Sequence, residues 1–431
     1  MLALIALGIV DFVVATPSKD VDRRVVGLPG TAIEASVPTR AITRGPKAHW
    51  FGYYDKFQFD SSGRYVLGME VNFEDRKPTA DDAVRLGMVD LREGDKWIPI
   101  GESRAWSWQQ GCMLQWLPGS DQEVIYNDRQ GDHYVSVIRN VFTGESRVLP
   151  RAIYSVSPDG KRAVGTNFAR IDDTRPGYGY KGVTDPYADE LAPAEDGIYA
   201  LDLTTGESRL IISIAQIAAI PQQYDTKGKH WFNHLLFNPD GTRFIFLHRA
   251  YQEPPKHGGW VTRMFTANPD GSGLHCMADH GMVSHFIWWN PKEILAWSKE
   301  PSGTHFHLYE DQRSHVETVG EGILTHDGHC TYSPDGNWIL TDGYPAKGRL
   351  QPLMLFRPAN GAPQNHPSAA DVKLVLLGRF YLPEGHTDEF RCDLHPRWSR
   401  DGNYVRIDSM HEGGMRQVYL LDVHETVHPA S

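Results

Sequence analysis

The chain has 431 residues and a formal net charge of −11, and 40% of its residues are hydrophobic. This composition supports a sizeable buried core and excludes wholesale disorder, while the negative charge argues against nucleic acid or an anionic membrane as a partner. The 41 Gly and 28 Pro indicate many turns, and 12 Trp, 18 Tyr and 17 Phe favour strands over helices. Twenty His are the first indication of a functional site.

The N-terminal segment resembles a secretion signal. Residues 2–16 are apolar and end in small residues, although they lack a basic start and contain Asp11. We therefore expect residues 1–30 to be a leader and flexible N-terminus of a secreted or periplasmic protein. Residues 31–431 are then expected to form one catalytic domain that acts as a monomer. No later segment reaches ~18 uninterrupted apolar residues, which argues against a protein that crosses a membrane several times.

A turn phrase recurs seven times along the chain. It consists of an aromatic residue, Ser-Pro-Asp-Gly or a variant of it, and then alternating apolar residues. The copies, numbered here as blades 1 to 7, begin at Phe57, Leu114, Tyr154, Leu235, Phe286, Cys330 and Pro396. Each copy has the pattern of two strands joined by a tight turn, and most are followed by a third strand. Seven four-stranded units of this kind predict an all-β fold, a single seven-bladed β-propeller.

The two ends of the chain are expected to close the ring together. Blade 7 ends soon after its third strand, at Asp422, so its fourth strand must come from elsewhere. The segment Thr39–Arg44, just before blade 1, is the candidate. This pairing would leave no open sheet edge.

Long loops predict which face of the ring binds a ligand. The repeated turns are short and all lie on one face, so the loop after each second strand lies on the opposite face. Four of these loops are long or unusual: Asn72–Arg85, Ala169–Asp196, Arg249–Gly259 and His411–Arg416. Binding residues concentrate on such loops, so we expect the site on that face.

Four histidines occupy equivalent positions at the start of the innermost strand in blades 4 to 7: His234, His285, His329 and His395. Because these strand starts encircle one channel, the imidazoles should converge, and a divalent metal is the partner that neutral imidazoles share best. Cys330 and Cys392 adjoin two of them, so a cysteine ligand would favour zinc over manganese or calcium. We expect a site formed by His285, His329, His395 and Cys392, with His326 as a further candidate. Alternatively, each histidine caps its own strand through a neighbouring carbonyl.

Blade 3 supplies a candidate acid or base. Tyr154 lies near the start of the innermost strand, and Arg170, sixteen residues on, should return to the same face at the end of the second strand. A neighbouring guanidinium lowers the pKa of a phenol, which suits it to proton transfer. The alternative is an ordinary tyrosine packed against a structural arginine.

Further polar residues are expected at the same mouth. Gln110 and Asn127 of blade 2 offer amide groups for a carboxylate or sugar hydroxyls, and His133 follows them. The segment HWFGYYDK brings His49, Tyr53, Tyr54 and Lys56 there, where aromatic rings either stack on sugars or form core. Arg249, with Arg170, Arg175 and Lys181, lies on the loops of this face and counters the unfavourable net charge for an acidic substrate.

With these residues in place, the chain resembles the propeller-type polysaccharide lyases, which include oligogalacturonate, ulvan and rhamnose-glucuronate lyases. The resemblance spans about His49 to Asp422. His285 and His329 look like metal ligands of the oligogalacturonate lyase pattern, and Tyr154 with Arg170 looks like the Tyr/Arg pair of the ulvan type. Where ulvan lyases place two histidines on the preceding blade, this chain has Gln109–Gln110 and Asn127–Asp128, which leaves room for a different uronate glycan.

The resemblance implies β-elimination at the C4–O4 bond of an acidic polysaccharide. Arg170 with Gln110 or Asn127 would neutralise the uronate carboxylate, and Tyr154 would act as base or acid with His234 or His133 as its partner. His49 and Arg249 would bind the substrate. The main alternative is a non-catalytic, TolB-like propeller that binds a protein or glycan. A serine peptidase lacks its G-x-S-x-G motif here, and Asp172, Asp173 and Glu310 do not form a convincing hydrolase pair.

Overall fold

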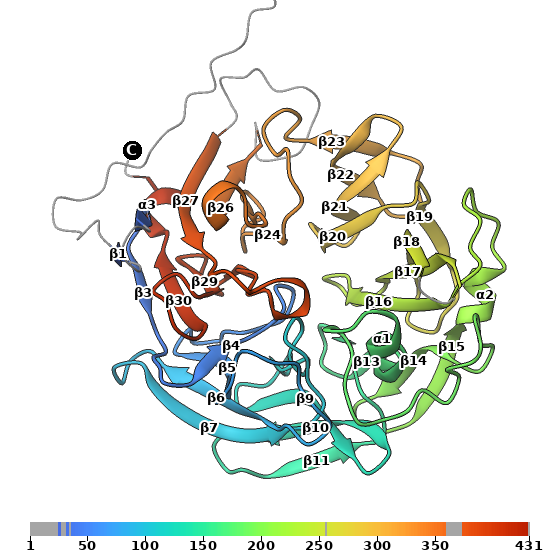
Figure 1. Cartoon of the computed structure of the whole chain (residues 1–431), viewed down its shortest axis with the longest axis horizontal. Coiled ribbons are helices and arrows are strands. Elements are labelled where there is room, and N and C mark those ends of the chain that lie inside the picture. The colour runs from blue at the N-terminus through green and yellow to red at the C-terminus, as the bar shows by residue number, and fades with distance from the viewer. Residues whose placement is uncertain (1–24, 27–31, 34–35, 255–256, 359–372, 430–431) are drawn as a thin grey trace, which may run out of the picture.

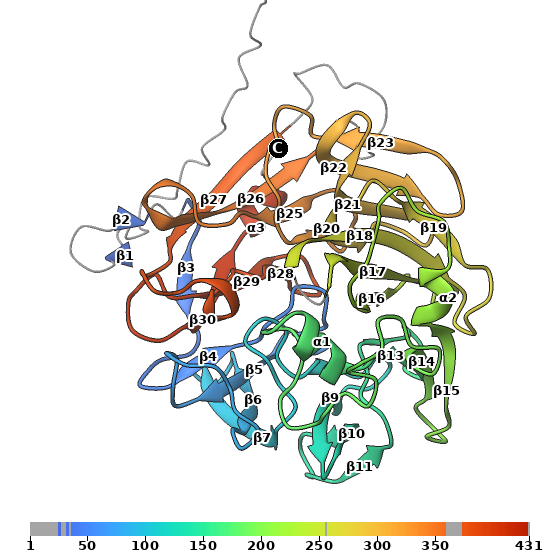
Figure 2. The same ribbon diagram turned by 45° about the vertical axis from the view of Figure 1, so that its right-hand side comes forward.

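The computed structural model describes residues 25–26, 32–33, 36–254, 257–358 and 373–429. Seven four-stranded antiparallel sheets follow one another around a ring in chain order (Figures 1 and 2), which confirms the predicted seven-bladed propeller. The expected leader over residues 1–30 lies outside the described residues except for β1 (Val25–Val26), which pairs with β2 (Ala32–Ile33).

Blades 1 to 3 each run from an inner to an outer strand in sequence order. Blade 1 consists of β4 (Ala48–Trp50), β5 (Tyr65–Val71), β6 (Val84–Asp90) and β7 (Lys96–Ser103). Blade 2 consists of β8 (Gln115–Trp116), β9 (Glu123–Gln130), β10 (His133–Asn140) and β11 (Ser146–Leu149). Blade 3 consists of β12 (Ser155–Val156), β13 (Arg162–Gly165), β14 (Gly197–Asp202) and β15 (Ser208–Ser213).

Blades 4 to 6 repeat this order with longer middle strands. Blade 4 consists of β16 (His230–Phe237), β17 (Phe244–Glu253), β18 (His257–Ala267) and β19 (His275–Ala278). Blade 5 consists of β20 (Val283–Trp288), β21 (Glu293–Glu300), β22 (Gly303–Glu310) and β23 (Val316–Val319). Blade 6 consists of β24 (Cys330–Tyr332), β25 (Ile339–Asp342), β26 (Leu350–Arg357) and β27 (Lys373–Tyr381).

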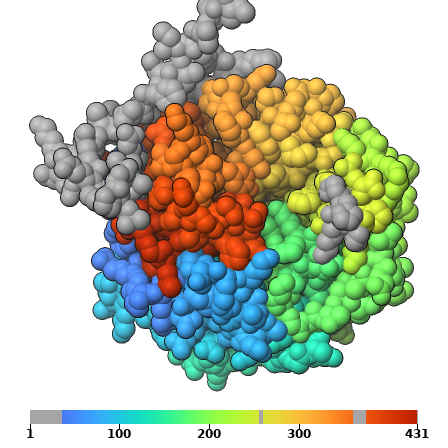
Figure 3. All heavy atoms as spheres, in the orientation of Figure 1, coloured from blue at the N-terminus to red at the C-terminus, as the bar shows by residue number. Residues whose placement is uncertain are grey.

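Blade 7 closes the ring with a strand from the other end of the chain. Its own strands are β28 (Arg397–Trp398), β29 (Tyr404–Ser409) and β30 (Gln417–Asp422). The fourth is β3 (Thr39–Ala41), which runs antiparallel to β30, as predicted. Blue β3 lies beside red β30 in Figure 1, and the red and blue surfaces adjoin in Figure 3.

The repeated turn owes its shape to one serine and one aspartate. In blade 3 the Ser157 hydroxyl accepts from the Arg162 amide at 3.0 Å, and the Asp159 carboxylate accepts from the Lys161 amide at 3.1 Å. Gly160 follows at a φ of 69°, a conformation that side chains with a Cβ disfavour. The same bonds recur in blades 6 and 7, so a short local motif defines the start of a blade.

The described residues form three short α-helices, two of them between strands and one after the last strand. They are α1 (Phe168–Thr174), α2 (Ile214–Ala218) and α3 (His424–Val427). Helix α1 begins at Asn167, whose side chain accepts from the amides of Ala169 and Arg170, and it faces the viewer in Figure 1. No helix in the described part of the chain is long and apolar enough to cross a membrane.

Candidate active site

The four histidines meet in one arc inside the ring. The ring centroids of His285 and His329 are 4.2 Å apart, those of His329 and His395 are 4.3 Å apart, and His234 lies 6.2 Å from His285. All four side chains are at most 4% exposed. Equivalent strand starts in consecutive blades thus bring together residues that are up to 161 positions apart in sequence.

Tyr53, which precedes blade 1, lies within this histidine arc. Its hydroxyl contacts both ring nitrogens of His234, Nδ1 at 2.9 Å and Nε2 more closely, and its ring centroid is 5.6 Å from that of His395. Burial, together with the neighbouring His285 and Arg175, lowers the pKa of His234 well below its usual 6.5. His234 is therefore neutral at pH 7 and able to accept a proton.

Carboxylates orient two of the imidazoles. His285 Nδ1 donates to Asp327 Oδ1 at 2.9 Å, and His329 Nδ1 donates to Asp342 Oδ2 at 2.9 Å. Burial lowers the pKa of His285, whereas at His329 the Asp342 carboxylate outweighs burial and raises the pKa. With Nδ1 as the donor, Nε2 is the ring atom left to accept once the imidazole is neutral, the arrangement usual in metal-ligating histidines.

Three of the described residues form a donor set that fits a metal ion. One ligand atom from each of His329, Asp393 and His395 lies within 4.8 Å of the others, and all three residues are buried. Nε2 of His395 is buried without a hydrogen-bond partner. Arg391 binds the Asp393 carboxylate, which retains further lone pairs for a cation. Two imidazoles and a carboxylate are ligands that divalent transition metals accept.

Cys392 lies apart from this donor set, contrary to the prediction. Its side chain packs with Leu382 and Met410 in a small apolar cluster, and burial raises the pKa of the thiol. Residue 392 is adjacent to Asp393 in the chain, but neighbouring residues of an extended segment point to opposite sides. The argument for zinc that rested on a cysteine ligand is therefore wrong.

The backbone is strained where two of the histidines project. His234 has a φ of 52° and His395 a φ of 43°, the left-handed region that costs a non-glycine residue roughly 1–2 kcal/mol. At His234 the pairing of β16 with β17 shifts register between Asn233 and Leu236. Strain of this kind is characteristic of residues whose side chains are held for function.

Tyr154 lies in the same interior with its hydroxyl bound to Gln110. The hydroxyl donates to Gln110 Oε1 at 2.9 Å, and Gln110 Nε2 is buried without a partner. Burial and the nearby Asp55 raise the pKa of Tyr154. The expectation of a lowered pKa is wrong, because the side chain is fully buried and the phenolate is poorly solvated.

Arg170 does not pair with Tyr154, contrary to the prediction. Strand β13 ends at Gly165 and the chain turns into α1, so Arg170 lies on a helix. Its Nε donates to the His230 carbonyl at 2.7 Å, and its terminal nitrogens bind Asp185 and the carbonyls of Tyr187, Glu190 and Leu191. Because all five N–H groups are used, Arg170 holds the blade 3 loop and has no donor left for a substrate.

Asn127 and His49 also have their polar atoms occupied. Asn127 binds the backbone of Ile153 through both amide atoms, at 2.7 and 2.8 Å, and so joins blade 2 to blade 3. His49 lies between Glu70 and Gln417, at 3.2 and 3.1 Å, and burial lowers its pKa. The predicted substrate contacts of these two residues do not fit these positions.

His133 and His326 lie on the surface rather than in the histidine arc. His133 is exposed and its Nδ1 contacts Asp132 at 3.1 Å. His326 is also exposed and contacts the Thr325 hydroxyl at 2.8 Å. By contrast, Arg249 is buried, and its guanidinium lies 5.8 Å from the ring of Trp260.

Sequence reasoning missed three carboxylates of the site, Asp327, Asp342 and Asp393, and it placed Tyr53 at this mouth without its histidine partner. Asp393 stands two residues before His395, a spacing that places both side chains on one side of an extended segment. This spacing would have allowed Asp393 to be predicted from the sequence. The partnership of Tyr53 with His234, and that of Asp327 with His285, join segments from different blades and leave no local pattern in the sequence.

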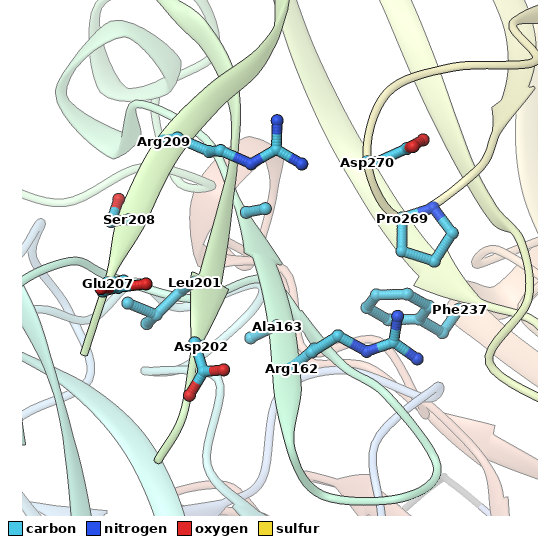
Figure 4. Close-up of a pocket in the computed structure, with 11 residues that line it drawn as sticks. Arg162, Ala163, Leu201, Asp202, Glu207, Ser208, Arg209, Phe237, Pro269 and Asp270 are labelled. Atoms are coloured by element: carbon cyan, nitrogen blue, oxygen red, sulfur yellow. The ribbon is translucent and has the colours of Figure 1, made fainter. Parts of the chain in front are cut away.

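A cavity of about 610 Å³ lies elsewhere, between hairpin turns of blades 3 and 4 (Figure 4). Arg209 points toward Asp270 across it, Arg162 and Asp202 also line it, and none of its lining residues belongs to the histidine arc. It lies on the face of the repeated turns, opposite the predicted binding face.

No protein-family profile matches the sequence, and no curated protein is detectably similar to it. Solved structures do share its fold. An oligogalacturonate lyase in complex with manganese is 16% identical, with a TM-score of 0.62 over 91% of this chain and 95% of that one. An oligogalacturonate lyase from Vibrio parahaemolyticus has the same identity, coverage and TM-score. TolB from Acinetobacter baumannii is 14% identical, with a TM-score of 0.37 over 84% of this chain and 81% of that one. The likeness to the two lyases establishes the propeller fold.

Proposed function

We propose that the protein is a polysaccharide lyase that cleaves a uronate-containing glycan by β-elimination and leaves an unsaturated uronate. The observation that carries this proposal is the grouping of three features in one interior: a metal-type donor set, a neutral imidazole and a neutral phenol. The fold that the chain shares with oligogalacturonate lyases supports the same reaction class. Such a substrate agrees with the secretion expected from residues 2–16.

The chemistry begins with the substrate carboxylate, which must be neutralised before the C5 proton becomes acidic. A divalent cation held by His329, His395 and Asp393 would supply that charge. Gln110 Nε2, buried and unpartnered, is a further donor for the carboxylate. Arg170 and Asn127 are excluded from this role by their own hydrogen bonds.

Proton transfer then falls to His234 and Tyr154. His234 takes the proton from C5, the electrons of that bond form C4=C5, and the C4–O4 bond breaks. Tyr154 donates its proton to O4 of the departing sugar. The shifted pKa values suit these roles, since the imidazole is neutral and the phenol keeps its proton until it is needed. Tyr53 contacts both nitrogens of His234 and so fixes the position of its ring.

The donor set narrows the choice of metal. Calcium prefers six to eight oxygen ligands, whereas two imidazoles with one carboxylate suit manganese or zinc. The manganese of one structurally similar lyase favours manganese here. Elemental analysis of the purified protein should find about one such ion per chain, lost in His395→Ala and kept in His326→Ala, which alters an exposed histidine. An ion-free protein whose Tm is unchanged by chelation would contradict this assignment.

The second candidate is a non-catalytic propeller that binds a protein or glycan. It is favoured by the burial of Tyr154, at 0% exposure, and of the four histidines. Incubation with pectin, ulvan, glucuronan and gum arabic separates the two candidates, because only a lyase produces the ultraviolet band of an unsaturated uronate. If none of these glycans gives the band in the presence of added manganese, the lyase proposal is excluded.

A further inference from the structure

Trp260 is one of four large hydrophobic side chains that the described residues expose, at 42%. It lies on β18, on the hairpin that follows the second strand of blade 4, and therefore on the predicted binding face. Its ring meets those of Trp231 and Tyr251 edge-on, with centroids 6.1 and 6.2 Å away. An aromatic ring held in this way is suited to stacking on a sugar.

Two guanidinium groups flank this ring. The Cζ of Arg249, on β17, is 5.8 Å from the Trp260 centroid, and the Cζ of Arg175, at the C-terminal end of α1, is 5.5 Å from it. Arg175 also lies 3.9 Å over the ring of Tyr178, which limits its freedom. Two positive charges thus converge on one exposed indole.

Both guanidinium groups have unused donors. Arg249 is 3% exposed, yet its Nε is buried without a hydrogen-bond partner, as is one terminal nitrogen of Arg175. Among the described residues neither arginine has an ion pair, whereas the buried Arg170, Arg243 and Arg416 each bind a carboxylate. The neighbouring Asp173 forms an ion pair with Lys229 at 2.7 Å. Uncompensated buried charge is costly, so this arrangement points to an anionic ligand.

The position of these groups relates them to the histidine arc. Helix α1 is tied to β16 by the bond from Arg170 Nε to the His230 carbonyl, and β16 carries His234 four residues on. Trp231, whose ring meets that of Trp260, lies on the same strand three residues before His234. A sugar on Trp260 would therefore lie beside the sugar that occupies the arc.

We propose that Arg175, Arg249 and Trp260 form a second sugar subsite, which binds an acidic sugar adjacent to the one that is cleaved. The indole stacks on the sugar ring, and the guanidinium groups bind its carboxylate through charge-assisted hydrogen bonds. This inference deepens the proposed function and rests on it for the order of the sugars. It implies that the substrate carries acidic groups on two neighbouring sugars.

Calorimetric binding to the full-length Tyr154→Phe protein, with manganese present, tests the subsite without turnover. The probes are trigalacturonate, triglucuronate, the methyl esters of both, and a sulfated neutral trisaccharide. Arg249→Gln should weaken binding of the preferred acidic trisaccharide about tenfold and leave binding of its ester unchanged, and Trp260→Ala should weaken both. Arg162→Gln, on the opposite face, is the matched control and should change neither. Equal binding of the sulfated sugar would overturn the assignment to a carboxylate, because it would show that the arginines accept either anion.

The subsite is overturned if no acidic trisaccharide binds, or if folded Arg249→Gln and Arg175→Gln proteins bind it as tightly as their parent. If Arg249→Gln does not fold, Trp260→Ala decides, because its side chain is exposed. The lyase proposal fails separately. If the wild-type protein forms unsaturated product but the arginine variants bind as tightly as their parent, only the subsite is contradicted. If binding depends on the arginines but no unsaturated product forms, only the lyase proposal is contradicted.

Discussion

At the scale of single residues, burial shifts the pKa values of Tyr154 and His234 in opposite directions. Burial raises the pKa of the phenol and lowers that of the imidazole, so both groups are neutral near pH 7. A neutral acid beside a neutral base is what an elimination needs, because one proton is taken and another is given. Neither state requires the Arg170 charge that the sequence analysis invoked.

The first prediction concerns the phenol. Tyr154→Phe removes one hydroxyl and keeps the buried ring, so kcat should fall by about 10²- to 10⁴-fold. The lost bond leaves Gln110 Oε1 buried without its donor, so the free energy of unfolding should fall by about 1–3 kcal/mol. Turnover and thermal unfolding measure the two effects, with Tyr199→Phe, whose hydroxyl binds the Glu195 carbonyl outside the arc, as the control. Undiminished kcat in Tyr154→Phe would exclude the phenol as the acid.

The second prediction concerns pH. His234 must be neutral to accept the C5 proton, and its pKa lies well below 6.5. Activity should therefore be constant through neutral pH and fall only in acid, below pH 6.5. A profile of kcat/KM against pH measures this. Arg175→Gln removes a positive charge that lowers this pKa, so it should move the acid limb upward. A wild-type acid limb at or above pH 6.5 would contradict the assignment of His234 as base.

At the scale of elements, α1 decides what blade 3 contributes. Its N-cap, Asn167, stops the strand pattern after β13, and Arg170 then binds the loop that follows. The helix therefore holds the loop on the predicted binding face and does not carry the predicted acid–base pair.

The third prediction follows from this role. Arg170→Ala would leave Asp185 buried without its cation and should lower the free energy of unfolding by about 3–5 kcal/mol. Arg162→Ala, in the same blade but with an exposed side chain, should cost about 0–1 kcal/mol. Chemical denaturation measures both values. An Arg170→Ala protein as stable as the wild type would show that these hydrogen bonds matter little.

Elements were predictable where their cause is local. In blades 3, 6 and 7 the serine and aspartate of the repeated turn bond within five residues. Variants of the same turn recur in the other blades, so the seven blades are visible in the sequence, and so is the convergence of their strand starts. The pairing of Tyr154 with Arg170 was wrong because it assumed a second strand that continued past Gly165. The bond between Asn127 and Ile153 joins two blades, and no local pattern announces it.

At the scale of the whole molecule, the ring depends on β3. Its residues pair with β30, while Val37 and Ile42 on either side of it are buried against other blades. One short strand thus joins the beginning of the described fold to its end, and it covers the last open edge.

The fourth prediction is that deletion of residues 1–44 opens the ring. The loss of two buried aliphatic side chains alone costs about 3–6 kcal/mol, and the exposed edge of β30 favours aggregation. The Tm should fall and light scattering on heating should rise, whereas Arg40→Ala, which loses only an exposed ion pair with Asp95, should change little. A truncated protein with the wild-type Tm would contradict closure by β3.

The central claim is that this propeller cleaves acidic glycans by elimination. Mass spectrometry of the products from pectin, ulvan, glucuronan and gum arabic tests it most directly, because an elimination product is lighter by one water molecule than the product of hydrolysis. The account predicts unsaturated fragments from at least one of these glycans with the wild-type protein, and none with His234→Ala. Saturated fragments, or intact glycans throughout, would contradict it.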